Sequence, residues 1–154
     1  MTIETWGSRT YPVEYTYDAQ DRMRTMKTWQ NFAGDAGTAT TRWNYDQHRG
    51  WLASKDYPDA STGQPPILEG TGGPAYTYTA AGRLSTRVWK RGITATYGYN
   101  SAGGLATIGY SDSTPGTTYS YDRRGRRSQV VRNGIRTAFT YPRVQPLARK
   151  RKKR

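Results

Sequence analysis

The sequence contains no cysteine and only one histidine, His48, in 154 residues. The absence of cysteine excludes disulfides, thiolate metal sites and a cysteine nucleophile, and a single histidine disfavours zinc sites built on several imidazoles. Apolar residues are also scarce, at 34% of the chain with a mean hydropathy of −0.95, which argues against a thick hydrophobic core. No apolar run approaches the roughly 18 residues of a membrane span. The N-terminal segment 1–12 carries no signal for export.

Aromatic residues, by contrast, are plentiful, with 13 Tyr and 5 Trp. Disordered segments are usually poor in such side chains, so we expect a folded chain in which tyrosine and tryptophan provide the packing. The formal net charge is +13, but 7 of the 24 basic residues lie in the last twelve positions, which contain no acid. Residues 1–142 therefore carry 17 basic and 11 acidic residues, and this main part of the chain is only mildly basic.

A short aromatic motif recurs along the chain: an aromatic residue, any residue, a tyrosine and then a turn-forming segment. The pairs are Tyr15/Tyr17, Trp43/Tyr45, Tyr76/Tyr78, Tyr97/Tyr99 and Tyr119/Tyr121, with a sixth at Phe139/Tyr141. The intervals between successive second tyrosines are 28, 33, 21, 22 and 20 residues, so the last three define a unit of about 21 residues.

Each pair leads into a segment that predicts a tight turn. Gly82, Gly103 and Gly125 all stand four residues after a second tyrosine, where a glycine can supply a positive φ, and Gly50 stands one position later. Alternating Thr, Val, Ile and Tyr between the turns indicate strands, so each unit is predicted to be a two-stranded hairpin with both aromatic rings on one face. The segment 22–32 has apolar residues at every third position, which is compatible with a short helical face, but the repeat pattern favours a strand.

A proline- and glycine-rich segment, 57–74, interrupts the repeats and is predicted to be a long loop. Its Gly70–Ala75 stretch has the spacing of a dinucleotide-binding loop, but the next residues predict a strand, and no helix is available to hold a pyrophosphate. Asp56 and Asp59 flank the start of the loop and do not have the spacing of a calcium loop, so we interpret them as solubilising residues. We expect no metal and no cofactor.

The repeated pattern Tyr-x-Tyr-Asp-x-x-Gly-Arg-Leu resembles the YD repeat of Rhs proteins, teneurins and Tc toxin complexes. The resemblance covers residues 13–141, and the residues that carry it are Tyr15, Tyr17, Asp18, Trp43, Tyr45, Asp46, Gly50, Tyr76, Tyr78, Gly82, Arg83, Leu84, Tyr97, Tyr99, Asn100, Gly103, Leu105, Tyr119, Tyr121, Asp122, Gly125 and Arg126. The chain departs from the pattern at Asp21, which replaces the turn glycine, at Gly104, which replaces the arginine, and at Arg127, which replaces the leucine. Because aspartate replaces glycine at position 21, the pattern does not predict the conformation of the first turn.

The resemblance implies an all-β fold of antiparallel hairpins that form a curved, incomplete shell sheet. It further implies a non-catalytic scaffold of bacterial secreted or surface proteins, with neighbouring repeats or a toxin cargo as partners. Some members of the family bind carbohydrate, which makes sugar a possible ligand, although a structural role for the tyrosines is favoured. The pattern stops after Tyr141, where Pro142 and unrelated residues follow, and one hypothesis is that the reading frame or the gene ends artificially here.

The segment 142–154 is predicted to be a disordered basic tail. Its final run, Arg149, Lys150, Arg151, Lys152, Lys153 and Arg154, can bind phosphate backbones through counterion release. An alternative function is therefore weak, non-specific nucleic-acid binding through this tail, although a solvated end without such a role is favoured. Catalysis is not expected, because the one histidine lies in a turn and no nucleophile with a turn signature accompanies it.

Overall fold

The computed structural model describes residues 2–4 and 12–142. The basic run Arg149–Arg154 and the rest of 143–154 lie outside the described residues, as do residues 5–11. Polyanion binding by the tail therefore stays a sequence-based prediction.

The described chain consists of strands joined by turns and loops. The strands are β1 (Thr2–Glu4), β2 (Val13–Tyr17), β3 (Met23–Thr28), β4 (Ala39–Tyr45), β5 (Leu52–Asp56), β6 (Ala75–Tyr78), β7 (Leu84–Val88), β8 (Thr94–Tyr99), β9 (Leu105–Tyr110), β10 (Thr117–Tyr121), β11 (Arg127–Arg132) and β12 (Ile135–Ala138). The segment 22–32, for which a helix was the alternative, thus contributes strand β3. Residues 57–74 connect β5 to β6.

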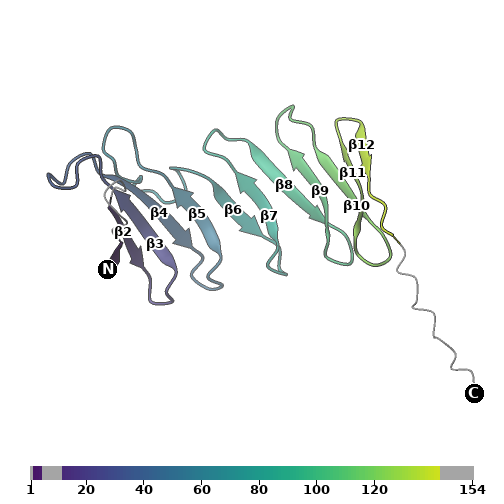
Figure 1. Ribbon diagram of the computed structural model, residues 1–154, viewed down its shortest axis with the longest axis horizontal. Coiled ribbons are helices and arrows are strands. Elements are labelled where there is room, and N and C mark those ends of the chain that lie inside the picture. Colours follow the sequence, from purple (N-terminus) through teal and green to yellow (C-terminus); the bar gives the residue numbers. More distant parts are fainter. Residues whose placement is uncertain (1, 5–11, 143–154) are drawn as a thin grey trace, which may run out of the picture.

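All twelve strands belong to one sheet, and their order in the sheet is their order in the sequence. Every neighbouring pair is antiparallel, including β5 and β6, which the long loop 57–74 connects. The predicted fold class, an all-β sheet of antiparallel hairpins, is confirmed. The sheet is an open strip that does not curl toward closure over these strands (Figure 1). None of the described residues forms a helix that could cross a membrane.

The five complete repeats are the hairpins β2–β3, β4–β5, β6–β7, β8–β9 and β10–β11, here numbered 1 to 5. Each contains the same irregularity beside its second tyrosine. In hairpin 4, Gly98 pairs with Thr107 but Tyr99 pairs with Leu105, so Ala106 is an extra residue on the returning strand. Equivalent register shifts follow Thr16, Asn44, Thr77 and Ser120. A bulge of this kind bends and twists the strand locally.

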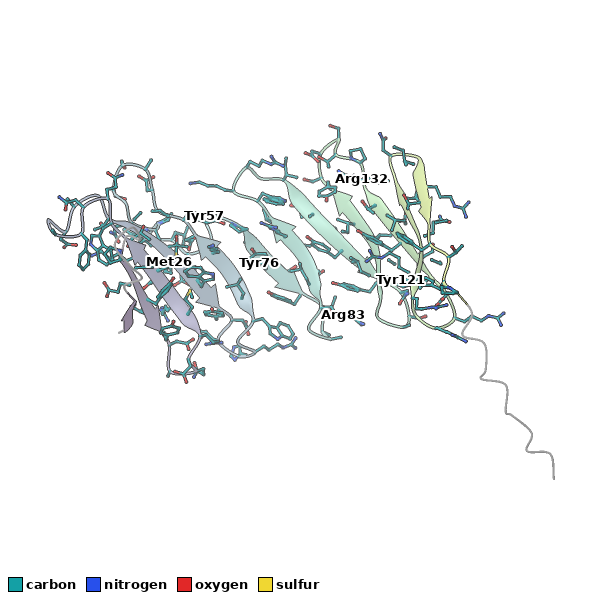
Figure 2. All side chains as sticks on the ribbon, in the orientation of Figure 1. Met26, Tyr57, Tyr76, Arg83, Tyr121 and Arg132 are labelled. Carbon is teal, nitrogen blue, oxygen red and sulfur yellow. The ribbon has the colours of Figure 1, made fainter. Side chains whose placement is uncertain are left out.

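The sheet is a single layer with very little core. Among the described residues only two hydrophobic side chains, Trp29 and Ala95, are buried. Figure 2 shows side chains projecting from both faces of the strip without a second sheet to cover them. The two aromatic residues of a pair lie two positions apart in a strand and so share one face. The opposite face carries small polar pairs, such as the hydrogen-bonded hydroxyls of Thr77 and Thr86 at 2.6 Å.

Candidate functional site

The second tyrosine of each repeat links its hairpin to the one before it. The hydroxyl of Tyr99, in hairpin 4, donates a hydrogen bond of 2.7 Å to the backbone carbonyl of Leu84, in hairpin 3. The same bond recurs at every junction after the first hairpin: Tyr45 to Met23, Tyr78 to Leu52, Tyr121 to Leu105 and Tyr141 to Arg127, at 2.7 to 2.9 Å. The described residues thus contain five equivalent hydroxyl-to-carbonyl links, four between consecutive hairpins and one from the incomplete sixth unit to hairpin 5.

The acceptor in each link is a carbonyl that the strand ladder leaves available. Strands β7 and β8 pair from Thr86 and Thr96 onward, so Leu84 lies beyond the end of the ladder between hairpins. Without a partner, such a carbonyl would depend on water. The tyrosine hydroxyl therefore holds two neighbouring hairpins together where their backbones no longer pair. Burial raises the pKa of the Tyr45 and Tyr78 hydroxyls, which favours the protonated, donating form.

The turn aspartates organise the chain reversals. Asp18 Oδ1 accepts the backbone N–H groups of Gln20 and Arg22, and its Oδ2 accepts the guanidinium Nε–H of Arg22 at 2.7 Å. Asp122 makes the equivalent bonds to Arg124 and Arg126. In both turns the hydrogen bonds from the arginine hold the pKa of the aspartate below its ordinary value. Where the aspartate is replaced, Asn100 and Thr79 still accept a backbone N–H of their own turn.

The turn glycines have left-handed backbone conformations. Gly82 and Gly125 have φ values of +77° and +75°, and Gly50 and Gly103 also have positive φ. Asp21, which occupies the glycine position of the first turn, also has a left-handed backbone conformation, with φ of +57°. Aspartate tolerates this region better than most residues, which explains how the first turn keeps its shape without glycine.

The residue that precedes the leucine position reaches across to the following hairpin. The guanidinium carbon of Arg22 lies 4.4 Å from the ring centroid of Tyr45, and Arg126 lies 4.2 Å from that of Tyr141. Each pair is a cation–π contact between consecutive hairpins. The sequence pattern includes an arginine at this position, but it did not predict that the arginine contacts the second tyrosine of the next unit or that this tyrosine binds a backbone carbonyl. An arginine that recurs just before the leucine position, with a second tyrosine in the next unit, is the signal that could have found the arginine–tyrosine contacts.

Hairpin 2 has Trp51 in place of the arginine. Its indole packs on the ring of Tyr78, with 5.0 Å between centroids. A hollow of about 300 Å³ opens beside it, lined by Asp46, His48, Arg49, Trp51, Ala53, Tyr76, Thr77 and Tyr78. The hollow therefore combines aromatic surfaces with side chains that can donate and accept hydrogen bonds.

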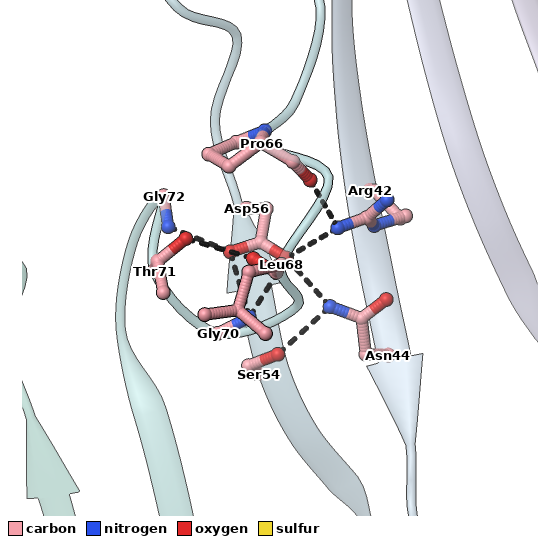
Figure 3. Close-up of polar contacts among 9 residues, drawn as sticks. All are labelled: Arg42, Asn44, Ser54, Asp56, Pro66, Leu68, Gly70, Thr71 and Gly72. Carbon is pink, nitrogen blue, oxygen red and sulfur yellow. Dashed lines mark hydrogen bonds and ion pairs between the residues drawn. The ribbon is translucent and has the colours of Figure 1, made fainter.

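A second polar cluster fixes the long loop 57–74 to the face opposite the tyrosines. Its centre is Asp56 on β5, which is fully buried, with 0% of its surface exposed. Arg42 and Asn44 of β4 donate to its Oδ2 at 3.1 and 2.7 Å. Two N–H groups from the loop, those of Gly70 and Gly72, donate to the same carboxylate at 2.8 to 3.1 Å (Figure 3).

This geometry corrects the interpretation of Asp56 as a solubilising residue. Every contact of its carboxylate in the cluster is with an N–H donor, which leaves no place for a calcium ion. Burial alone would raise its pKa, but the hydrogen bonds from Gly70, Gly72, Arg42 and Asn44 outweigh burial and lower it. The glycine-rich stretch does bind an anion through backbone N–H groups, but that anion is the protein's own aspartate. Asp59, in contrast, lies on the exposed loop and accepts the N–H of Ser61.

Comparison with known proteins gives a likeness in structure only. No family model matches the chain. No curated protein matches it either. Among solved structures, it is similar to a chain of a variant Tc holotoxin pore from Photorhabdus luminescens, with 21% identity, 80% of this chain covered and a TM-score of 0.59. Two TcdB2-TccC3 structures match with 20% and 19% identity, 82% of this chain covered and TM-scores of 0.61 and 0.63. At this identity the likeness shows the fold, and the chain spans only 5 to 6% of the length of these proteins.

Proposed function

We propose that the chain is a YD-repeat segment of an Rhs-type bacterial protein, secreted or displayed on the cell surface, and that it acts as a scaffold without catalysis. The four hydroxyl-to-carbonyl links between consecutive hairpins, with the fifth from Tyr141 to hairpin 5, carry this proposal. They join hairpins that have almost no core of their own into one continuous strip, as a wall of a larger shell requires. The fold likeness to chains of Tc toxin structures supports the same role.

The partners of such a scaffold are further hairpins of the same kind or a toxin cargo enclosed by the wall. Strand β12 has no neighbour on its outer side among the described residues, and all four of its residues are exposed. An open edge of this kind offers unpaired backbone groups to another strand. The opposite edge of the strip is β1, which pairs only with β2 among the described strands.

The scaffold proposal is tested by native-state hydrogen exchange on the full chain. If the strip works as one wall, the amides in the ladders between hairpins, such as those of β7 with β8, should show protection comparable to the ladders within hairpins. A chain whose hairpins open independently, with unprotected ladders between them, would refute the proposal.

A second candidate function is carbohydrate binding, favoured by the hollow beside Trp51. Indole and phenol rings present apolar faces to a pyranose ring, while Asp46 and Arg49 can bond its hydroxyls. Glucose, galactose, N-acetylglucosamine and glucuronic acid are suitable probes, with intrinsic Trp fluorescence and ligand-detected NMR as readouts. Binding should be lost in Trp51→Ala and persist when 143–154 are deleted. Absence of binding by all four sugars, or equal binding by Trp51→Ala, would reject this candidate.

A further inference from the structure

One position in the repeat determines which side chain covers the junction between two consecutive turns. It is the residue just before the leucine position, and it is occupied by Arg22, Trp51, Arg83, Gly104 and Arg126 in hairpins 1 to 5. The four large side chains all lie over the second tyrosine of the following unit, which for Arg126 is Tyr141 after β12. Their distances to its ring centroid are 4.4 Å for Arg22, 5.0 Å for Trp51, 5.1 Å for Arg83 and 4.2 Å for Arg126.

The same side chains cover the turn glycine of the following hairpin. A β-carbon added to Gly50 would meet the guanidinium of Arg22, and one added to Gly103 would meet that of Arg83. One added to Gly82 would lie 3.0 Å from the indole of Trp51. Gly125, which follows the hairpin with Gly104, has nothing within 4 Å of such a carbon. The junction between hairpins 4 and 5 is therefore uncovered because of one sequence substitution.

A hollow of about 330 Å³ lies at this junction. It is lined by Asn100, Ala102, Gly104, Tyr121, Asp122, Arg123 and Gly125. We call it the Gly104 slot. Two of these groups, a turn glycine and a second tyrosine, also lie against the guanidinium of Arg22 and that of Arg83 at their junctions.

We propose that the Gly104 slot binds an arginine side chain presented by another protein chain. The planar guanidinium would stack on the ring of Tyr121 as Arg22 stacks on Tyr45 within this chain. Arginine suits the slot better than lysine, because its flat, weakly hydrated cation stacks on aromatic faces. The proposal rests on the internal repetition of the junction and is independent of the scaffold role.

The charges around the slot are compatible with a cation. Asp122 lies in its wall, although its carboxylate is bound by Arg126 at 2.8 Å. Arg123 also lines the slot and opposes a second cation, but it is exposed at the turn tip. A guanidinium can stack on the second tyrosine without a carboxylate in the turn that carries the arginine. Arg83 shows this, because it lies over Tyr99 although its own turn has Thr79 at the aspartate position.

The test is an NMR titration of the full chain with Nα-acetyl-arginine N-methylamide. The neutral citrulline analogue, which has almost the same shape, is the control ligand. We expect shifts of the Tyr121 ring and of the Gly104 and Gly125 amides that are about two- to fivefold larger with the arginine probe, as a cation–π contact predicts. Removing the competing charge in Arg123→Ala should increase them further.

Gly104→Arg supplies the missing side chain from within the chain and should abolish these shifts. An added β-carbon would lie 3.2 Å from the Asn100 amide nitrogen and 3.4 Å from a Tyr121 ring carbon, so both side chains must shift slightly to admit the arginine. Gly109→Arg is the matched control, since it adds the same charge at a strand position with nothing within 4 Å, and it should retain the shifts. Equal responses to arginine and citrulline, or shifts that persist in a folded Gly104→Arg variant, would overturn the proposal.

Discussion

The hydroxyl of Tyr99 reaches across a hairpin boundary to the backbone carbonyl of Leu84, 2.7 Å away. Leu84 pairs with Tyr78 inside its own hairpin, and Tyr78 in turn reaches back to Leu52. Each of hairpins 2 to 5 thus supplies both a donor to the hairpin before it and an acceptor for the unit after it. The stability of the strip accordingly depends on interactions between neighbours, because a central core is absent from the described sheet.

Removing one of these links should weaken the sheet measurably. Tyr99→Phe deletes the hydroxyl and leaves the Leu84 carbonyl without its donor, and we expect the free energy of unfolding to fall by about 1 kcal/mol. Tyr76→Phe is the matched control, because no hydrogen bond of its hydroxyl is seen in the described part of the chain. Urea denaturation followed by circular dichroism provides the comparison. Equal midpoints for Tyr99→Phe and the wild type would show that the link contributes nothing.

Alanine substitutions at two turn glycines can distinguish the cost of backbone strain from the cost of side-chain crowding. Gly82 and Gly125 have nearly the same φ, +77° and +75°, but only Gly82 has a neighbour, Trp51, close to the position of a β-carbon. Alanine at either site should destabilise the fold by about 1 kcal/mol or more through φ alone. Gly82→Ala should be the more destabilising of the two. Thermal unfolding of both variants tests this order, and a larger loss in Gly125→Ala would contradict the packing of Trp51.

Asp56 should be the most sensitive position in the loop attachment. In Asp56→Asn an uncharged amide replaces a buried carboxylate that is surrounded by N–H donors, and we expect a loss of about 3 kcal/mol. Asp59→Asn makes the same chemical change on the exposed part of the loop and should leave the denaturation midpoint almost unchanged. Denaturation midpoints that are the same for the two variants would contradict the anchoring role of Asp56.

The stability of the chain should also depend on pH through Asp56. Its pKa in the folded state lies below the value of about 3.9 for an unfolded chain. A depressed carboxyl pKa stabilises the fold above the unfolded value, and this stabilisation is lost as the pH falls through the folded pKa. Between pH 7 and pH 2 the wild type should therefore lose more stability than Asp56→Asn. Parallel loss in the two proteins, measured by urea titration at each pH, would exclude this contribution.

Much of this architecture is readable from the sequence because it is local and repeated. The aromatic pairs and the turn residues fixed the expectation of antiparallel hairpins, which the structure confirms. The links between hairpins could not be predicted in the same way, because the acceptor of Tyr99 is a backbone carbonyl that carries no sequence signal. Asp56 was misinterpreted for a related reason: its donors, such as Gly70 and Gly72, come from a loop whose path the sequence does not specify.

The first turn allows a direct test of the repeat pattern, because Asp21 has a φ of +57° where the other turns use glycine. A β-carbon in this region costs about 1 kcal/mol, which an aspartate partly offsets, whereas glycine avoids the strain but loses more entropy on folding. Asp21→Gly should therefore raise the stability by about 0.5 kcal/mol, and Asp21→Ala should lower it by a similar amount. Both variants remove the same charge, so the difference between them reports the backbone alone. Thermal melts in which alanine equals or exceeds glycine would show that Asp21 does not need the left-handed conformation.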